Sequence, residues 1–175
     1  MLAYLFVLLA IAVRFLPHPL AFTPVAASLL FFGARGPRRQ LCIPLVLLAA
    51  SDVILTKWIY VYSFSWDHFV TWVWYGAVLF LGTRLREHTK WPWIAGSALA
   101  SSVSFYLLSN FAVWACWNMY PKTAAGLMAS YVVGLPYFQR SLVADLLFTV
   151  AMFAAPVIVT QFSHRSGRSS GPAAA

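Results

Sequence analysis

The sequence has very few charged residues, and acidic residues are the scarcest. Only 9% of the 175 residues are charged, just four of them are Asp or Glu, and 62% are hydrophobic. Such a chain has too few polar side chains to cover a soluble globule, which predicts a membrane protein with one compact domain. The net charge of +8 is spread over the gaps between apolar runs, so nucleic acid is not an expected partner.

Recognisable motifs of catalysis and metal binding are missing too. The sequence contains no H-E-x-x-H, no glycine-rich phosphate loop, no candidate Ser-His-Asp set and no spacing typical of a closed zinc site. We therefore expect no enzyme, no catalytic residues, no metal site and no cofactor. The only two cysteines, Cys42 and Cys116, are predicted on opposite sides of the membrane, too far apart for a disulfide.

What the sequence does have is long apolar runs, separated by gaps of two alternating kinds. The basic gaps hold Arg35, Arg38 and Arg39, then Arg84, Arg86 and Lys90, and finally Arg165 and Arg168 in the tail. The gaps between them, at 17–21, 57–67 and 110–140, are poor in Lys and Arg and together rich in Trp, Tyr and Phe. Positive residues favour the cytoplasmic side, so the basic gaps are predicted inside and the others outside.

The apolar runs predict six membrane-spanning helices. Their expected ranges are 2–16, 22–34, 41–56, 68–83, 92–109 and 141–162. The first lacks a basic segment ahead of it and a cleavage site, which predicts a retained helix. A seventh apolar segment, 123–138, contains Gly126, Gly134 and Pro136, so we expect a short or re-entrant helix on the outer side. Both termini are then cytoplasmic, with one domain at 1–162 and a disordered tail at 163–175.

The outer connections hold most of the candidate binding residues. These are His18, Trp58, Trp66, Asn110, Trp114, Cys116, Tyr120, Lys122 and Tyr137. An aromatic belt at the lipid headgroups accounts for any single Trp or Tyr. A belt decorates both interfaces, however, and the inner gaps have little beyond Trp91 and Trp93. A lid over a pocket therefore explains the pattern better.

Two carboxylates inside the predicted spans complete the candidate site. Asp52 and Asp145 lie in the outer halves of their helices, and buried carboxylates in lipid usually face a bundle interior or a wet cavity. The structural alternatives are Asp52 capped by a Ser or Thr of a neighbouring helix, and Asp145 paired with Arg140 near a helix start. Asn110 equally suits a helix C-cap. Cys116 is either a small filler or a ligand to a soft metal centre such as a corrin cobalt.

Four stretches carry a resemblance to known proteins. FTPVAASLLFFGARGP, PLVLLAASD, LLSNFAVWACWNMYPKTAAGL and GLPYFQRSLVADLLF resemble an uncharacterised family of small bacterial integral-membrane proteins over about residues 17 to 160. That family is similar to the substrate-binding S components of energy-coupling factor vitamin transporters, whose last helix begins with a Pro-Phe…Asp element. Pro136, Tyr137 and Asp145 are the nearest counterparts, although Tyr replaces Phe and the spacing to the Asp differs.

The resemblance implies a six-helix bundle with both termini inside and a vitamin-sized pocket beneath the outer loops. It also implies the bacterial inner membrane and, as a partner, an energy-coupling module of a transmembrane subunit and ATPases. The first helix has no clear alanine face of the kind that docks such a module, so a solitary transporter is the alternative. A cobalamin carrier is a further alternative, by analogy only.

The sequence as a whole predicts a membrane protein that binds a small, vitamin-like organic molecule at its outer face and passes it inward. Aromatic side chains would stack on a planar substrate while a few polar groups orient it. The other interpretation is a non-transporting scaffold or assembly partner, whose outer aromatic residues contact another protein. Rings turned inward around a cavity favour the first interpretation, and an open aromatic face favours the second.

Overall fold

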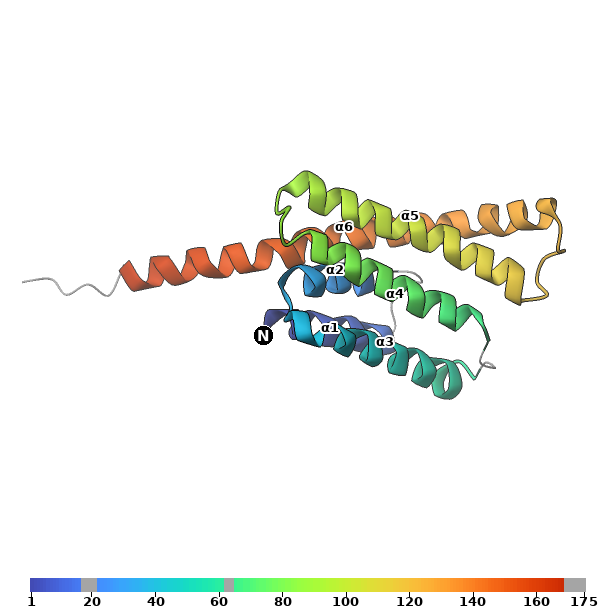
Figure 1. Cartoon of the computed structure of the whole chain (residues 1–175), viewed down its shortest axis with the longest axis horizontal. Coiled ribbons are helices and arrows are strands. Elements are labelled where there is room, and N and C mark those ends of the chain that lie inside the picture. The colour runs from blue at the N-terminus through green and yellow to red at the C-terminus, as the bar shows by residue number, and fades with distance from the viewer. Residues whose placement is uncertain (17–21, 62–64, 169–175) are drawn as a thin grey trace, which may run out of the picture.

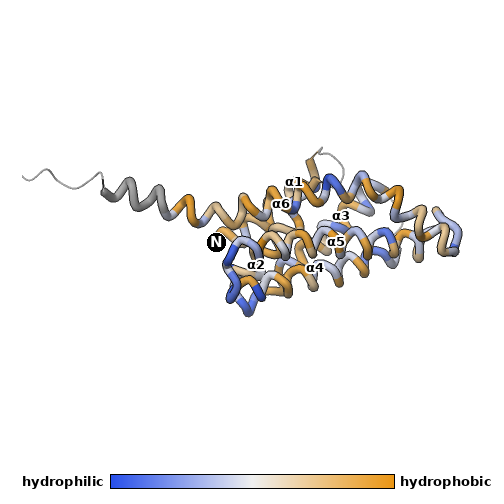
Figure 2. The backbone as a smooth tube through the Cα atoms, turned by 90° about the horizontal axis from the view of Figure 1, so that it is seen from above, coloured by the Kyte–Doolittle hydropathy of each residue, from blue (hydrophilic) through white to orange (hydrophobic). Residues whose placement is uncertain are grey.

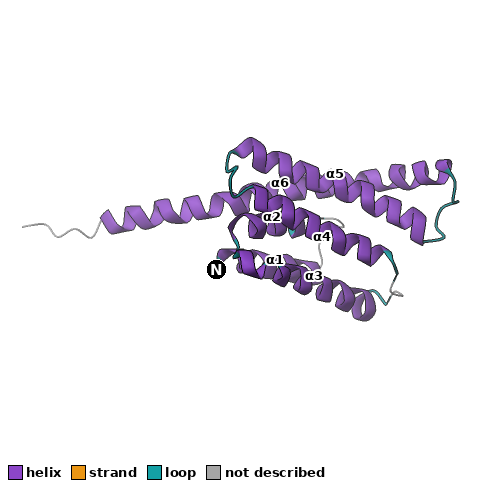
Figure 3. Cartoon of the chain, in the orientation of Figure 1, coloured by secondary structure: helices purple, strands orange, loops and turns teal. Residues whose placement is uncertain are grey.

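A computed structural model of the chain describes residues 1–16, 22–61 and 65–168, and these residues form helices and connections without a strand (Figure 1; Figure 3). The α-helices are α1 (Leu2–Phe15), α2 (Val25–Arg35), α3 (Cys42–Ile54), α4 (Asp67–Arg84), α5 (Trp91–Cys116) and α6 (Ala124–Arg168). A 3₁₀ turn, η1 (Arg38–Gln40), precedes α3, and a π-helical turn, η2 (Leu55–Ile59), follows it. The expected all-α class is confirmed.

Consecutive helices run in alternating directions, so the connections gather at two ends of the bundle. The N-terminus and the connections 36–41 and 85–90 lie at one end, which we call the basic end (Figure 1). The C-terminus of η2, the N-terminus of α4 and the connection 117–123 lie at the opposite end, which we call the aromatic end. Figure 2 shows hydrophilic backbone positions concentrated at the basic end. Two of the three basic gaps of the sequence, at 35–39 and 84–90, therefore lie at the same end of the bundle.

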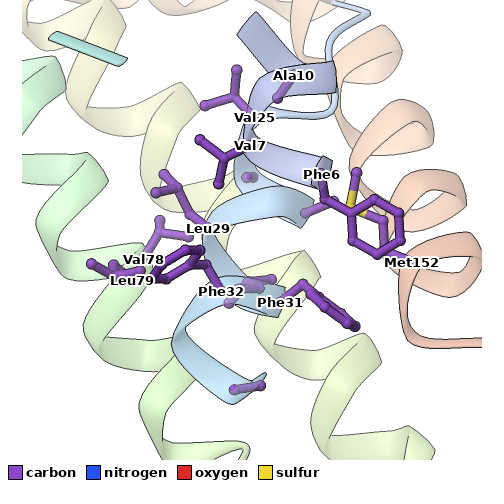
Figure 4. Close-up of a cluster of buried hydrophobic side chains, with 14 of the residues drawn as sticks. Phe6, Val7, Ala10, Val25, Leu29, Phe31, Phe32, Val78, Leu79 and Met152 are labelled. Carbon is purple, nitrogen blue, oxygen red and sulfur yellow. The ribbon is translucent and has the colours of Figure 1, made fainter. Parts of the chain in front are cut away.

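The short helix α2 forms the centre of the bundle. Every residue from Val25 to Ala34 is buried, which is typical of a helix that is hydrophobic all round. Phe31 packs edge-on against Phe6 of α1 and Phe153 of α6, with ring centroids 4.9 and 5.2 Å apart (Figure 4). Because other helices surround α2, its side chains contact protein and not lipid. The helix therefore does not need the length of one that spans a bilayer by itself.

Two glycines allow α2 and α4 to approach closely. A Cβ on Gly33 would lie 2.8 Å from the backbone of Gly82 on α4, and small residues are the usual means of such contact in membranes. Arg86, just after α4, donates from Nε to the carbonyl of Gly33 at 2.7 Å and from a terminal nitrogen to that of Gly36 at 2.5 Å. It thereby satisfies carbonyls at the C-terminus of α2. Burial and the nearby Arg38 lower the pKa of Arg86.

Three helical stretches are long and apolar enough to cross a membrane. They are Arg38–Ile59, Trp91–Cys116 and Ala124–Thr160, and α1 and α2 are shorter apolar helices. Large apolar side chains point outward along them, for example Val46 of α3 at 64% exposure and Val132 of α6 at 59%. Extensive apolar exposure of this kind suits a lipid environment. The structure is therefore that of a helical membrane-associated protein.

The expected separate helix or re-entrant piece at 123–138 is wrong. This segment and the predicted last span form one helix, α6, which contains Pro136 and Pro156 in its interior. Gly126 and Gly134 are contact points and not breaks, because a Cβ on either would collide with Pro121 or Asn110. Membrane helices also tolerate an internal proline. Of the tail expected to be disordered, residues 163–168 continue α6.

The expected long outer stretch at 110–140 is wrong for the same reason. Helix α5 extends to Cys116, seven residues beyond the expected end at 109, and α6 begins at Ala124. Residues 117–123 are all that connects them, which is too short a segment to form a lid of the predicted kind. Helix α2 begins at Val25, after Thr23 and Pro24, and is only 11 residues long.

Candidate functional site

A cavity of about 390 Å³ lies in the half of the bundle nearer the aromatic end. It is positioned by helix length, because α1 and α2 are short and the other four helices extend further toward the aromatic end (Figure 1). All six helices contribute to its wall. Its volume falls within the range of roughly 300 to 1,000 Å³ typical of small-molecule sites. The lining residues are Arg14, Thr23, Val25, Ala26, Asp52, Leu55, Thr56, Tyr60, Asp67, His68, Thr71, Trp74, Tyr75, Phe105, Ser141 and Asp145.

Asp52 is the centre of a hydrogen-bonded cluster on one side of the cavity. Arg14 forms an ion pair with its Oδ1 and also donates to Ser51 Oγ at 2.9 Å. Trp72 Nε1 donates to Asp52 Oδ2 at 3.0 Å, and the Tyr75 hydroxyl donates to Oδ1 at 3.3 Å. Both carboxylate oxygens therefore have partners. The partner of Asp52 is an arginine rather than the Ser or Thr that the sequence offered as a structural alternative.

Asp145 lies on α6 and is only 4% exposed. Ser102 of α5 donates a hydrogen bond to its Oδ2 at 2.6 Å. Among the described residues no cation pairs with Asp145, so the predicted alternative of an Arg140 ion pair is not formed. A carboxylate buried without a counter-ion is costly. Asp145 is thus a buried acidic group of the cavity that has no cationic partner among the described residues.

A second polar group lies where α4 begins. His68 Nδ1 lies 3.2 Å from the carbonyl of Ser65 and Nε2 lies 2.8 Å from Thr56 Oγ1. Because the carbonyl can only accept, Nδ1 carries the hydrogen of that bond, and Nε2 pairs with the Thr56 hydroxyl. Asp67 Oδ1 is buried, 3.4 Å from His68 Nδ1, and makes no hydrogen bond among the described residues.

Aromatic side chains form the apolar wall of the cavity. Trp74 and Tyr75 of α4 are 5% and 4% exposed, and Phe105 faces Trp74 from α5 with the ring centroids 4.7 Å apart. Trp74 Nε1 donates to Ser104 Oγ at 3.0 Å, which satisfies the indole and fixes its orientation. The cavity thus combines fixed rings with a small number of polar groups.

A smaller cavity of about 50 Å³ adjoins the first, and the two share Phe105 and Ser141. Asn110 and Tyr137, both predicted as site residues, line this second cavity. Asn110 donates from Nδ2 to the carbonyl of Tyr106 at 2.8 Å, inside α5, so it is not the helix C-cap that the sequence allowed. Predicted residues from α3, α5 and α6 therefore meet around two adjoining cavities.

The remaining predicted residues lie elsewhere. Trp58 and Trp66 are 81% and 75% exposed at the aromatic end and line neither cavity. Cys116 is a free, exposed thiol at the last position of α5, so it is not a buried filler. Tyr120 lies in the connection 117–123 and lines neither cavity. His18 lies outside the described residues.

Lys122 and Trp114 hold the connection between α5 and α6 together. Lys122 Nζ donates to the carbonyls of Trp114, Ala115 and Trp117, the last two at 3.2 and 2.7 Å. Trp114 Nε1 donates to the carbonyl of Pro121 at 2.9 Å. An ammonium has three donors, and these three carbonyls near the C-terminus of α5 occupy them. The predicted ligand-binding lysine therefore acts as a helix cap in this structure.

Sequence reasoning missed most of the cavity residues. Asp67, Thr71 and Trp74 recur at helical spacing on α4, so their position on one face of a predicted helix was the available signal. Arg14 was not predicted as a site residue. No short motif marks Phe105, Ser102 or Ser141. Within the described residues, no group of three His, Cys, Asp or Glu side chains could hold a metal ion.

Comparison with known proteins gives one match. The model of a family described as "Family of unknown function (DUF6580)" matches residues 1–166. No curated protein and no solved structure matches the chain. The family match covers all six helices except the last two residues of α6, including every residue of both cavities.

Proposed function

Because the chain belongs to DUF6580, a family of unknown function, we propose a function from its own residues: it binds a small organic molecule in the larger cavity and carries it across a bacterial cytoplasmic membrane. The observation that carries this proposal is the buried carboxyl group of Asp145, which has no cationic partner among the described residues, in a cavity walled by Trp74, Tyr75 and Phe105. Ionisable groups within membrane helices are rare, face the bundle interior or a water-filled cavity, and mark substrate or ion pathways.

We propose a multi-pass topology in which the basic end faces the cytoplasm. The charge distribution supports it, since Arg35, Arg38 and Arg86 belong to the basic end and positive residues stay inside. The cavity would then be reached from the outer side. Helix α6 has 45 residues and is about 68 Å long, more than twice the hydrocarbon thickness of a bilayer, so its C-terminal part would extend into the cytoplasm.

The partner in this proposal is an energising module of the energy-coupling factor type, as the resemblance to S components implies. The alternative is a solitary carrier, which works without such a module. Co-purification of a tagged chain expressed from its own genome, followed by identification of associated ATPases, distinguishes the two. An associated ATPase pair supports the module, and its absence under conditions that preserve transport supports the solitary carrier.

A second candidate function is favoured by the outward-facing tryptophans. Trp58 and Trp66 are exposed at the aromatic end, where a scaffold protein would contact a partner. The same two side chains also suit an aromatic belt at the lipid headgroups. Alanine at both positions separates the functions, because a scaffold loses its protein partner and a carrier keeps its bound small molecule.

The proposed function is tested by native mass spectrometry of the full chain in lipid nanodiscs. We expect the wild type to retain a small molecule, and Phe105→Ala, which opens the cavity wall, to lose it. The matched control is Phe80→Ala, a Phe on α4 whose side chain is 62% exposed on the bundle surface. A wild type that remains empty, even after incubation with a metabolite extract, contradicts the proposal.

A further inference from the structure

The ionisable groups around the larger cavity fall into two classes. Some form an ion pair within the protein, and the others have no strong ion-pair partner among the described residues. Arg14 is the cavity's only arginine or lysine among the described residues, and it is bound to Asp52 and Ser51. The positive charge of Arg14 is therefore paired within the protein and is not available to a ligand. An anionic ligand would have to displace Asp52, which also accepts hydrogen bonds from Trp72 and Tyr75.

The ionisable groups of the second class are carboxyl groups, those of Asp145 and Asp67. Asp145 is buried without a cation, and Asp67 presents a buried Oδ1 that makes no hydrogen bond among the described residues. Asp67 occupies the first turn of α4, where the N-terminus of the helix compensates part of its charge. Asp145 lies at the interior of α6, far from either helix terminus, and has no such compensation. The strongest uncompensated potential in the cavity is thus at Asp145.

The aromatic wall of the cavity sets a second requirement for the ligand. Trp74, Tyr75 and Phe105 line it, and the π faces of aromatic rings attract cations, most strongly those of Trp. Rings held by packing and by the Trp74–Ser104 hydrogen bond also favour a flat apolar group over a flexible chain. The same cavity therefore offers a counter-charge and stacking surfaces.

We propose that the larger cavity selects an organic cation, a planar aromatic or heterocyclic compound carrying a positively charged nitrogen that pairs with Asp145. This inference rests on the proposed function, because it names the substrate class of the same cavity. In the loaded state the nitrogen neutralises the Asp145 carboxylate, Ser102 keeps its hydrogen bond to Oδ2, and the ring system lies against the aromatic wall. Asp67 contributes a weaker, longer-range attraction.

The test uses three probes that share one bicyclic ring and differ in charge. They are N-methylquinolinium, neutral quinoline and a quinoline carboxylate, each measured by equilibrium dialysis against the full chain in nanodiscs at neutral pH, with empty nanodiscs subtracted. We expect the cation to bind about tenfold or more tightly than neutral quinoline, and the carboxylate to bind most weakly.

Asp145→Asn is the decisive variant, because it removes the charge and keeps an acceptor for Ser102. We expect it to abolish the preference for the cation while binding of neutral quinoline changes little. Glu87→Gln, an acid-to-amide change at an exposed residue of the connection 85–90, is the matched control and should leave all three affinities unchanged. Unfolding temperatures of both variants confirm that the bundle is intact.

The outcomes separate the two proposals. Saturable binding of quinoline or its carboxylate equal to or tighter than the cation overturns the cation inference and leaves the cavity as a binding site. A cation preference that survives in Asp145→Asn overturns the role of Asp145. Absence of saturable binding for all three probes, together with an empty wild type in native mass spectrometry, overturns the proposed function itself.

Discussion

Arg14 in the last turn of α1 forms an ion pair with Asp52 of α3, a residue 38 positions later in the chain. Their side chains are 16% and 8% exposed, so the pair lies largely out of water at the edge of the cavity. This contact joins α1 to α3 and at the same time removes the positive charge of Arg14 from the set available to a ligand. The selectivity proposed for the cavity depends on that neutralisation.

Breaking this pair from one side is predicted to destabilise the bundle. Arg14→Met leaves Asp52 buried without its counter-ion, which costs about 3 kcal/mol or more in the free energy of unfolding. Chemical unfolding in detergent micelles measures it. The double variant Arg14→Met with Asp52→Asn should recover a substantial part of the loss, because no buried charge remains. Strictly additive effects of the two substitutions would contradict a direct pair.

The contact between α5 and α6 gives a second prediction. A Cβ added at Gly134 would lie 2.8 Å from Cγ of Asn110, so Gly134→Ala must displace the Asn110 side chain from its hydrogen bond to Tyr106 and costs about 1 to 3 kcal/mol. Gly96→Ala on α5 is the control, because nothing lies within 4 Å of its added Cβ. The control should be neutral or stabilising, since alanine is the better helix former. Equal unfolding temperatures for the two variants would argue against the close packing.

Lys122 is predicted to be structural. Replacing it with Met removes the three hydrogen bonds to carbonyls near the C-terminus of α5, so hydrogen exchange should accelerate at residues 114–123. Probe affinity should stay unchanged. Lys57→Met, a change at another exposed lysine, serves as the control for lost surface charge. Reduced probe binding with unaltered hydrogen exchange would instead identify Lys122 as a ligand-binding residue.

The two native cysteines provide the topology test. Cys42 is exposed at the start of α3, at the basic end, and Cys116 is exposed at the end of α5, at the aromatic end (Figure 1). In intact spheroplasts an impermeant thiol reagent should label Cys116 in the Cys42→Ser variant and spare Cys42 in the Cys116→Ser variant. Lysis should expose Cys42 to labelling. The reverse pattern would place the basic end outside.

The sequence predicted the helical class and the grouping of the basic connections because both follow from local patterns. Apolar runs set the helices, and alternating charge requires alternating direction, which α1 to α6 display. The break expected at Gly134 and Pro136 was wrong, since a glycine against Asn110 serves packing and a membrane helix absorbs a proline. Local composition does not reveal which neighbour a small residue will meet.

Prediction of the site was limited for the same reason, because a sequence pattern reports on residues that are close in the chain and not on those that meet in the fold. Asp52 and Asp145 were recognised because a carboxylate within an apolar run is informative on its own, and both line the cavity. The pairing of Asp52 with Arg14 depends on tertiary contact and left no trace in either segment. Tryptophan side chains could not be assigned to the cavity or to the surface from the sequence, because buried Trp74 and exposed Trp58 both stand among other aromatic residues in the chain.

The central claim is that the cavity bounded by Asp145 and Trp74 holds a small molecule. The most direct measurement is an experimental structure, at side-chain resolution, of the full chain in nanodiscs saturated with N-methylquinolinium. The account predicts ligand density between Asp145 and the Trp74–Phe105 wall, with the Arg14–Asp52 pair intact. A cavity closed by side chains, or probe density only on the outer surface near Trp58 and Trp66, would contradict it.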